Sequence, residues 1–209
     1  MNSDFGTIAF GTVMGGAGSR LAGGNFWQGA VTGLIVSMMN HMMHKIKIRN
    51  EIESKSPRLY KTLSKLKSFV KSNEDLFNSL SETSGYSHKE VLKLLSVSNL
   101  SSMLTVDEQG DWGHFSEKDP SKISIRASLI RGLEMVKLPE NLNATSFFAA
   151  EVVLHEFVHY GRYWNGLSDM VKINGTSYEA GEVFETNAFG RIIGINGNTQ
   201  TMNSNGWKF

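Results

Sequence analysis

The chain has 209 residues, with 21 Lys and Arg against 20 Asp and Glu, and therefore a net charge of +1. This balance provides no basic field of the kind that steers proteins to nucleic acid, so we expect no nucleic-acid partner. Cysteine is absent, which excludes disulfide frameworks, iron–sulfur clusters, Cys-ligated zinc and thiol nucleophiles. Any metal ion must be held by His, Asp or Glu.

Residues 1–45 differ in composition from the rest and are predicted to form a Gly-rich leader. Nine glycines lie between Gly6 and Gly33, and this argues against one long helix through residues 1–44. The apolar run 26–39 has 14 residues, fewer than the roughly 20 that cross a bilayer. This short length favours a segment that packs against other parts of a protein, with membrane contact of residues 26–43 as the alternative. The N-terminus lacks the pattern of a signal peptide, so we expect none.

Residues 46–209 are predicted to form one domain of the α+β class, helix-rich with a small sheet. Residues 45–71 are rich in basic side chains and carry an apolar stripe at helical spacing. The stripe consists of Leu59, Leu63, Leu66 and Val70. The basic face is a solvated helix surface or, alternatively, a surface for an anionic partner. A second helix is predicted over 87–95, with Ser87 and Glu90 as a capping box. A loop over 109–121, a half-buried strand over 122–127 and a helix of about ten residues follow.

The segment 145–162 contains the motif His155-Glu156-Phe157-Val158-His159, which is an HExxH. Its apolar spacing predicts a buried helix with Ser146 as the cap and Gly161 at the end. Side chains four residues apart on a helix are neighbours, so His155 and His159 can hold one zinc ion. Glu156 is then placed as the general base for the water that the metal activates.

A third ligand must come from further along the chain, because the next helical turn after His159 offers none. The helix after the HExxH helix is predicted to begin at Ser177, and three glutamates follow its start at three-residue intervals: Glu179, Glu182 and Glu185. Residue spacing alone leaves all three open as ligands.

HExxH followed by a glutamate on the next helix resembles the gluzincin zinc peptidases. The run from Glu185 to Gly190 is similar to the E-A-N-x-F-A pattern of small gluzincins that cleave phage repressors. The resemblance implies that Glu185 is the metal ligand, with Asn187 and Phe189 as supporting positions, and that Glu182 orients a histidine. With Glu179 as the ligand, the spacing would instead resemble thermolysin.

This resemblance implies metal-assisted hydrolysis of a peptide bond, with Glu156 moving a proton to the leaving amine. The strand over 122–127 would be the edge of the cleft and pair with an extended peptide. A donor to the oxyanion is also required. Four side chains are candidates: His114, Tyr160, Tyr163 and Tyr178.

The segment GGNFWQGAVTGLIVSMMNHMMHK, within residues 10–45, resembles the Gly-rich boundary at the end of Rhs-type polymorphic toxin cores. The sequence pattern HEFVHYG…ExGxxFE…FG is similar to the metallopeptidase toxin domains that follow such toxin cores. The two resemblances imply a secreted C-terminal effector that a specialised system delivers into a target cell. They also imply a cognate immunity protein as a partner.

Two other functions fit the same residues. One is a metal-dependent hydrolase of non-peptide amides, such as a cell-wall amidase, because the same metal chemistry serves both. The other is a catalytically inactive module that acts on membranes or binds a partner; the intact Glu156 argues against it. No phosphate-binding loop or dinucleotide fingerprint is present, so we expect no nucleotide cofactor.

Overall fold

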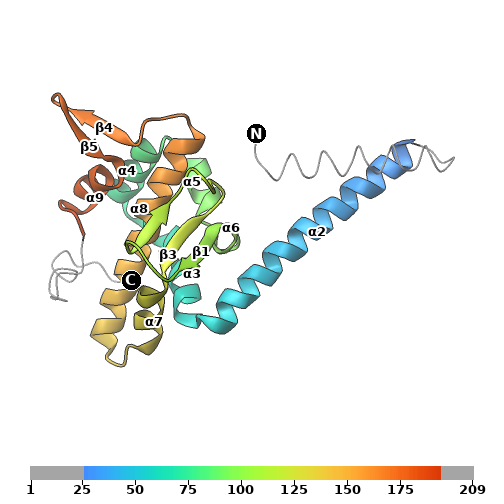
Figure 1. The fold of residues 1–209 in the computed structure, drawn as a ribbon, viewed down its shortest axis with the longest axis horizontal. Helices are drawn as coiled ribbons and strands as arrows, with labels where there is room; N and C mark the ends of the chain where they lie inside the picture. Colours follow the sequence, from blue (N-terminus) through green and yellow to red (C-terminus); the bar gives the residue numbers. More distant parts are fainter. Residues whose placement is uncertain (1–25, 194–209) are drawn as a thin grey trace. The chain divides into compact units, whose positions relative to one another are not determined.

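The computed structural model describes residues 26–193, and the Gly-rich leader before residue 26 lies outside the described residues. The chain divides into two units, residues 1–48 and 49–209. Helix α2 (Phe26–Lys55) continues unbroken through the predicted boundary at residues 45 and 46, which stays a prediction (Figure 1). Between residues 26 and 44 the expectation of no long helix is wrong, because the apolar helix formers tolerate Gly29 and Gly33. No helix within residues 26–193 has the length and apolar character of a membrane span.

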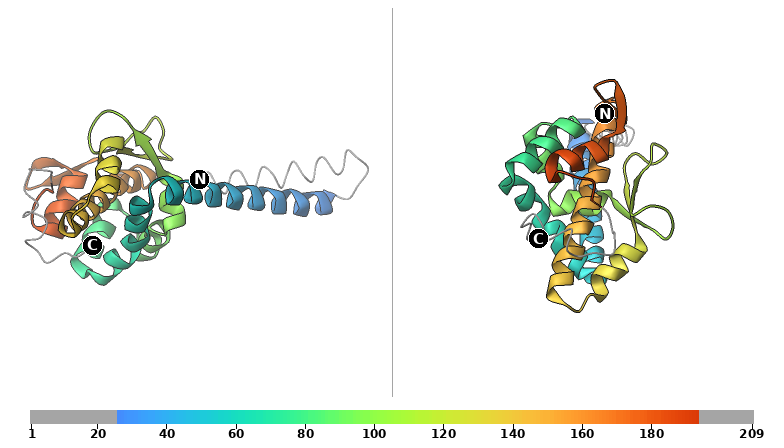
Figure 2. Two further views of the ribbon diagram at one scale, coloured as in Figure 1. Left: turned by 90° about the horizontal axis from the view of Figure 1, so that it is seen from below. Right: turned by 90° about the vertical axis from the view of Figure 1, so that its left-hand side faces the viewer.

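The second unit is built around one long helix, α8 (Pro139–Trp164) (Figure 2). Against it pack α3 (Pro57–Ser72), α4 (Glu74–Ser84), α7 (Ala127–Met135) and α9 (Ala180–Phe189). The apolar stripe predicted from helical spacing is buried on α3, as expected. Helices α5 (His88–Leu94) and α6 (Val97–Met103) follow α4. The capping box of Ser87 and Glu90 is formed at the start of α5.

Helix α8 begins earlier and ends later than the predicted segment 145–162. Pro139 occupies its first turn, where the missing N–H costs nothing, so this proline starts the helix. Ser146 is buried inside the helix and is not its cap. Gly161 does not end it either. A Cβ at Gly161 would lie 2.7 Å from the carbonyl oxygen of Ser84, so the glycine permits close packing of α4.

A three-stranded sheet lies on the side of α8 opposite α3 and α4 (Figure 2). Its strands are β1 (Leu104–Asp107), β2 (Gly113–Phe115) and β3 (Ile123–Arg126), in the order β1-β3-β2. β3 is parallel to β1 and antiparallel to β2. Ile123 and Ile125 are buried as the alternation predicts. However, β3 is the central strand and β2, within the predicted loop, is the edge next to α8.

A hairpin of β4 (Met170–Ile173) and β5 (Thr176–Glu179) joins α8 to α9. Its two-residue turn is Asn174-Gly175, with φ of 50° and 83°, values that only such residues adopt readily. Ser177 therefore lies in a strand and does not start a helix. The helix begins at Ala180, and its N-cap is Glu179. The predicted α+β class, helix-rich with small sheets, is confirmed.

Candidate metal centre

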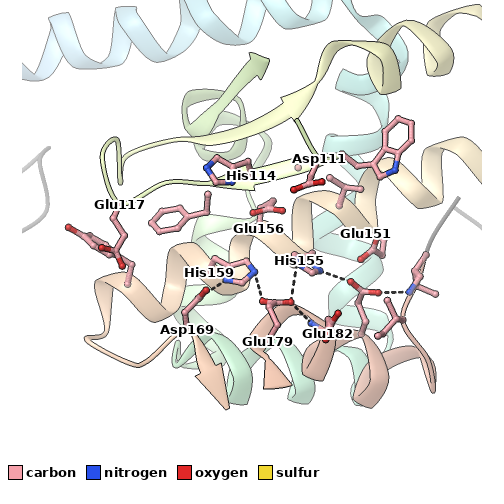
Figure 3. A pocket seen from close by; sticks show the side chains of 18 of the residues that line it. Asp111, His114, Glu117, Glu151, His155, Glu156, His159, Asp169, Glu179 and Glu182 are labelled. Carbon is pink, nitrogen blue, oxygen red and sulfur yellow. Dashed lines mark hydrogen bonds and ion pairs between the residues drawn. The ribbon is translucent and has the colours of Figure 1, made fainter. Parts of the chain in front are cut away.

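The two histidines of the HExxH motif face the same space beside α8. Their ring centroids lie 5.1 Å apart, as the four-residue helical spacing requires. Both rings line a cavity of about 880 Å³ between α8, β2 and α9 (Figure 3). The predicted pairing of His155 and His159 on one helix face is thus present in the structure.

Glu179 brings a carboxylate to the outer nitrogens of both rings. Its Oε1 lies 2.6 Å from Nε2 of His159, and its Oε2 lies 3.4 Å from Nε2 of His155. One donor atom from each of these three residues falls within 4.8 Å of the others. Two imidazoles and one carboxylate are the ligands that zinc peptidase sites use. The donor set therefore fits a divalent metal ion.

The local fold fixes the position of Glu179. As the last residue of β5 and the N-cap of α9, it accepts hydrogen bonds from the N–H groups of Gly181 at 2.7 Å and Glu182 at 2.9 Å. Gly181 also lets α9 approach α8, because a Cβ there would collide with the ring of His155. A hairpin, a helix cap and a glycine together hold this carboxylate against the histidines.

The inner nitrogens of the two rings are paired with other carboxylates. Nδ1 of His155 lies 2.5 Å from Glu185, and Nδ1 of His159 lies 2.5 Å from Asp169. The second oxygen of Glu185 accepts from the backbone N–H of Ile193. Such carboxylates fix the orientation of a metal-binding imidazole.

The predicted ligand Glu185 therefore contacts the opposite nitrogen of His155 from the one that faces Glu179. It belongs to a separate group with Glu151 and His155, and it does not converge on His159. Glu182 lines the cavity, and its own backbone N–H donates to Glu179. The residue spacing left Glu179 open as a ligand, and the structure brings that residue to both rings.

The pKa values follow from these pairings. Burial favours the neutral imidazole of His159, but Glu179 and Asp169 outweigh burial and raise its pKa to about 9. Burial also favours the neutral form of Glu179, yet the hydrogen bonds from His159 and Gly181 lower its pKa to about 2. Glu179 is therefore an anion at neutral pH, as a metal ligand must be.

Glu156 is buried and lines the same cavity as the two histidines. Gly113 of β2 lies directly against it, because a Cβ at Gly113 would be 2.6 Å from Cγ of Glu156. Burial raises the pKa of Glu156, although the neighbouring histidines oppose the shift. A carboxylate with a raised pKa inside a cleft is suited to proton transfer near neutral pH.

Comparison with known protein families matches residues 52–190 to the family of metallopeptidase toxin 3. The match covers about two thirds of the chain and contains both histidines and every carboxylate of the metal centre described above. The chain belongs to the metallopeptidase toxin 3 family. It is thus a metallopeptidase toxin, as its resemblance to the metallopeptidase toxin domains predicts, and its substrate is a protein. Comparisons with curated proteins and with solved structures gave no match.

Several residues of this toxin's cavity had not been singled out in the sequence. Asp169 lies in a loop that Arg162 holds, by donating from Nε to the carbonyl oxygen of Ser168. The signal for the hairpin that carries Glu179 was the Asn174-Gly175 pair.

Of the four candidates for the oxyanion donor, His114 and Tyr163 line the cavity, whereas Tyr160 and Tyr178 are not among its lining residues. The Rhs-like leader, which precedes the family match, stays a prediction.

Proposed function

We propose that this toxin is a zinc peptidase whose metal ion is held by His155, His159 and Glu179. The convergence of Glu179 on Nε2 of both rings carries this proposal. We assign Glu185 and Asp169 to the orientation of the rings, because each is paired with an inner nitrogen. This assignment replaces Glu185, which the resemblance to small gluzincins had implied as the ligand.

Glu156 is proposed as the general base. It follows His155 directly and faces the same cavity, with a carboxylate whose pKa is raised by burial. A zinc ion bound here would supply a Lewis acid and lower the pKa of a water molecule. Glu156 would accept a proton from that water and transfer it to the leaving amine.

The free edge of β2 is the proposed site for the peptide backbone of the substrate. Within the described residues, β2 is paired with β3 on one side only. Its first residue, Gly113, contacts Glu156, and His114 and Phe115 also line the cavity. An extended peptide that adds to this edge would run past the proposed base. The strand predicted for this role, β3, is covered on both sides.

Delivery remains an inference from the resemblance of the leader to Rhs-type boundaries. A toxin family implies action in a target cell. We propose in addition that an Rhs-type secretion system exports the chain and that the producing cell protects itself with an immunity protein. The protein substrate of the family favours a peptidase over a cell-wall amidase.

The Glu156→Gln variant tests the reaction, because it removes the base and keeps the metal ligands. We expect it to retain about one zinc ion per chain and to lose hydrolysis by a factor of at least about 100. New protein N-termini, mapped by mass spectrometry in cells that express each form, should appear with the wild-type chain and not with the variant. Equal toxicity of both forms would support an inactive membrane-acting module instead.

A further inference from the structure

The wall of the cavity is strongly acidic, in contrast to the balanced charge of the whole chain. Among the described residues that line it are eight Asp or Glu side chains and no Lys or Arg. The chain as a whole carries +1. The negative charge is therefore concentrated at the site where a substrate must bind.

Four of these carboxylates are not assigned above as a metal ligand, as the base or as the partner of a ring nitrogen. They are Asp111, Glu117, Glu151 and Glu182. They come from the loop before β2, the turn after it, α8 and α9, so separate elements bring them to one cavity. In Figure 3, Glu117 lies toward one end, and Asp111, Glu151 and Glu182 lie toward the other. The acidic wall thus extends on both sides of the two histidines.

At one end of the wall, one carboxyl oxygen of Glu151 lacks a hydrogen-bond partner. The Glu151 side chain is 3% exposed and lies beside Glu185, and its Oε1 has no hydrogen-bond partner within the described structure. It lines the cavity together with Phe148 and Trp112, whose rings pack edge to face at 5.8 Å. A buried polar atom without a partner is costly. Apolar walls that end in a carboxylate oxygen suit the long stem and cationic head of Lys or Arg.

We propose that the toxin selects cationic peptide segments, with Lys or Arg next to the cleaved bond, through Asp111, Glu117, Glu151 and Glu182. This inference rests on the proposed peptidase function and names its substrate class. Even with Glu151 protonated and a divalent ion present, the carboxylates outnumber the positive charges of the wall. Basic peptides would be attracted and acidic ones repelled by this concentration of like charge.

The test uses the full-length, zinc-loaded chain and a mixture of short random-sequence peptides, with cleavage sites read by mass spectrometry. We expect Lys and Arg to be enriched, and Asp and Glu depleted, on either side of the cleaved bonds. A well-cleaved peptide is then resynthesised with acetyl-lysine, which keeps the stem and removes the charge. Its kcat/KM should fall about tenfold or more.

Two variants connect the preference to the wall. In Asp111→Asn combined with Glu182→Gln, the ratio of kcat/KM between the lysine and acetyl-lysine peptides should fall at least about threefold. The matched control is Glu140→Gln, an exposed glutamate in the first turn of α8 outside the cavity, which should keep the wild-type ratio. Cleavage without regard to charge would overturn the inference and leave the peptidase function standing.

Binding to the Glu156→Gln variant decides the inference independently of hydrolysis. Fluorescence anisotropy should show tighter binding of the lysine peptide than of its acetylated form. Equal binding of the two would overturn the inference. If the wild-type chain hydrolyses no peptide while the charge preference in binding persists, the proposed reaction fails and the acidic cleft still stands as a binding site for cationic peptides.

Discussion

At the scale of single residues, the site depends on which nitrogen of each histidine a carboxylate contacts. Glu179 faces the outer nitrogens, and Glu185 and Asp169 hold the inner ones. The motif residues could be predicted from the sequence because a four-residue helical spacing is a local property. The position of Glu179 beside both rings could not, because it depends on how closely α9 approaches α8 at Gly181.

The same pairings predict a pH dependence for the stability of the metal-free chain. His159 has a pKa of about 9 in the fold, above its ordinary value of 6.5. Its protonated form therefore stabilises the fold fully below pH 6.5, and this contribution is lost as the pH rises through 9. Glu179 has the opposite sign: its contribution is present above pH 4.5 and is lost as the pH falls through 2.

Chelator-treated protein should consequently melt at a lower temperature at about pH 9.5 than at about pH 6. The free energy of unfolding should be lower at the higher pH, by on the order of 2 kcal/mol. Thermal denaturation followed by circular dichroism measures this difference. His159→Gln is the control and should show a smaller pH dependence. An equal dependence in that variant would show that another group is responsible.

At the scale of elements, local signals predicted those parts that depend on neighbours in the chain. The leucine stripe of α3, the capping box at Ser87 and the alternation in β3 are of this kind. Pro139 lies in the first turn of α8, where a proline is tolerated, and the helix therefore starts six residues before the predicted segment 145–162. Strand β2 has only three residues, and its pairing with β3 is a contact between segments that periodicity does not report.

The hairpin of β4 and β5 offers a prediction at this scale, because it places Glu179 at the end of a strand. Gly175 has a φ of 83°, and no atom lies within 4 Å of a Cβ built there. Gly175→Ala should therefore act through backbone strain alone, at a cost of about 1 kcal/mol. We expect zinc affinity to fall about fivefold, measured by titration calorimetry.

Gly110→Ala provides the matched control for this variant. Gly110 also has a positive φ, of 96°, and equally open surroundings, but it lies outside the hairpin. It should lose similar stability and keep its zinc affinity. Equal weakening of zinc binding in both variants would mean that general destabilisation, and not the position of Glu179, is the cause.

At the scale of the whole molecule, the unit of residues 49–209 contains the family match, the acidic cavity and every proposed ligand. The α+β class and the toxin family could be predicted from the HExxH motif and its surroundings. The acidity of the cavity could not, because its carboxylates come from segments that are distant in sequence and the net charge of the chain is nearly zero. Folding brings those charges together.

The zinc content and zinc affinity of three purified forms, the wild type, Glu179→Gln and Glu185→Gln, test the central assignment most directly. We predict about one zinc ion per wild-type chain. In Glu185→Gln, the loss of an orienting carboxylate should lower the zinc affinity about 10- to 100-fold. In Glu179→Gln, the loss of the proposed ligand should lower the zinc affinity further. Wild-type zinc binding by Glu179→Gln, together with loss of zinc from Glu185→Gln, would contradict the account.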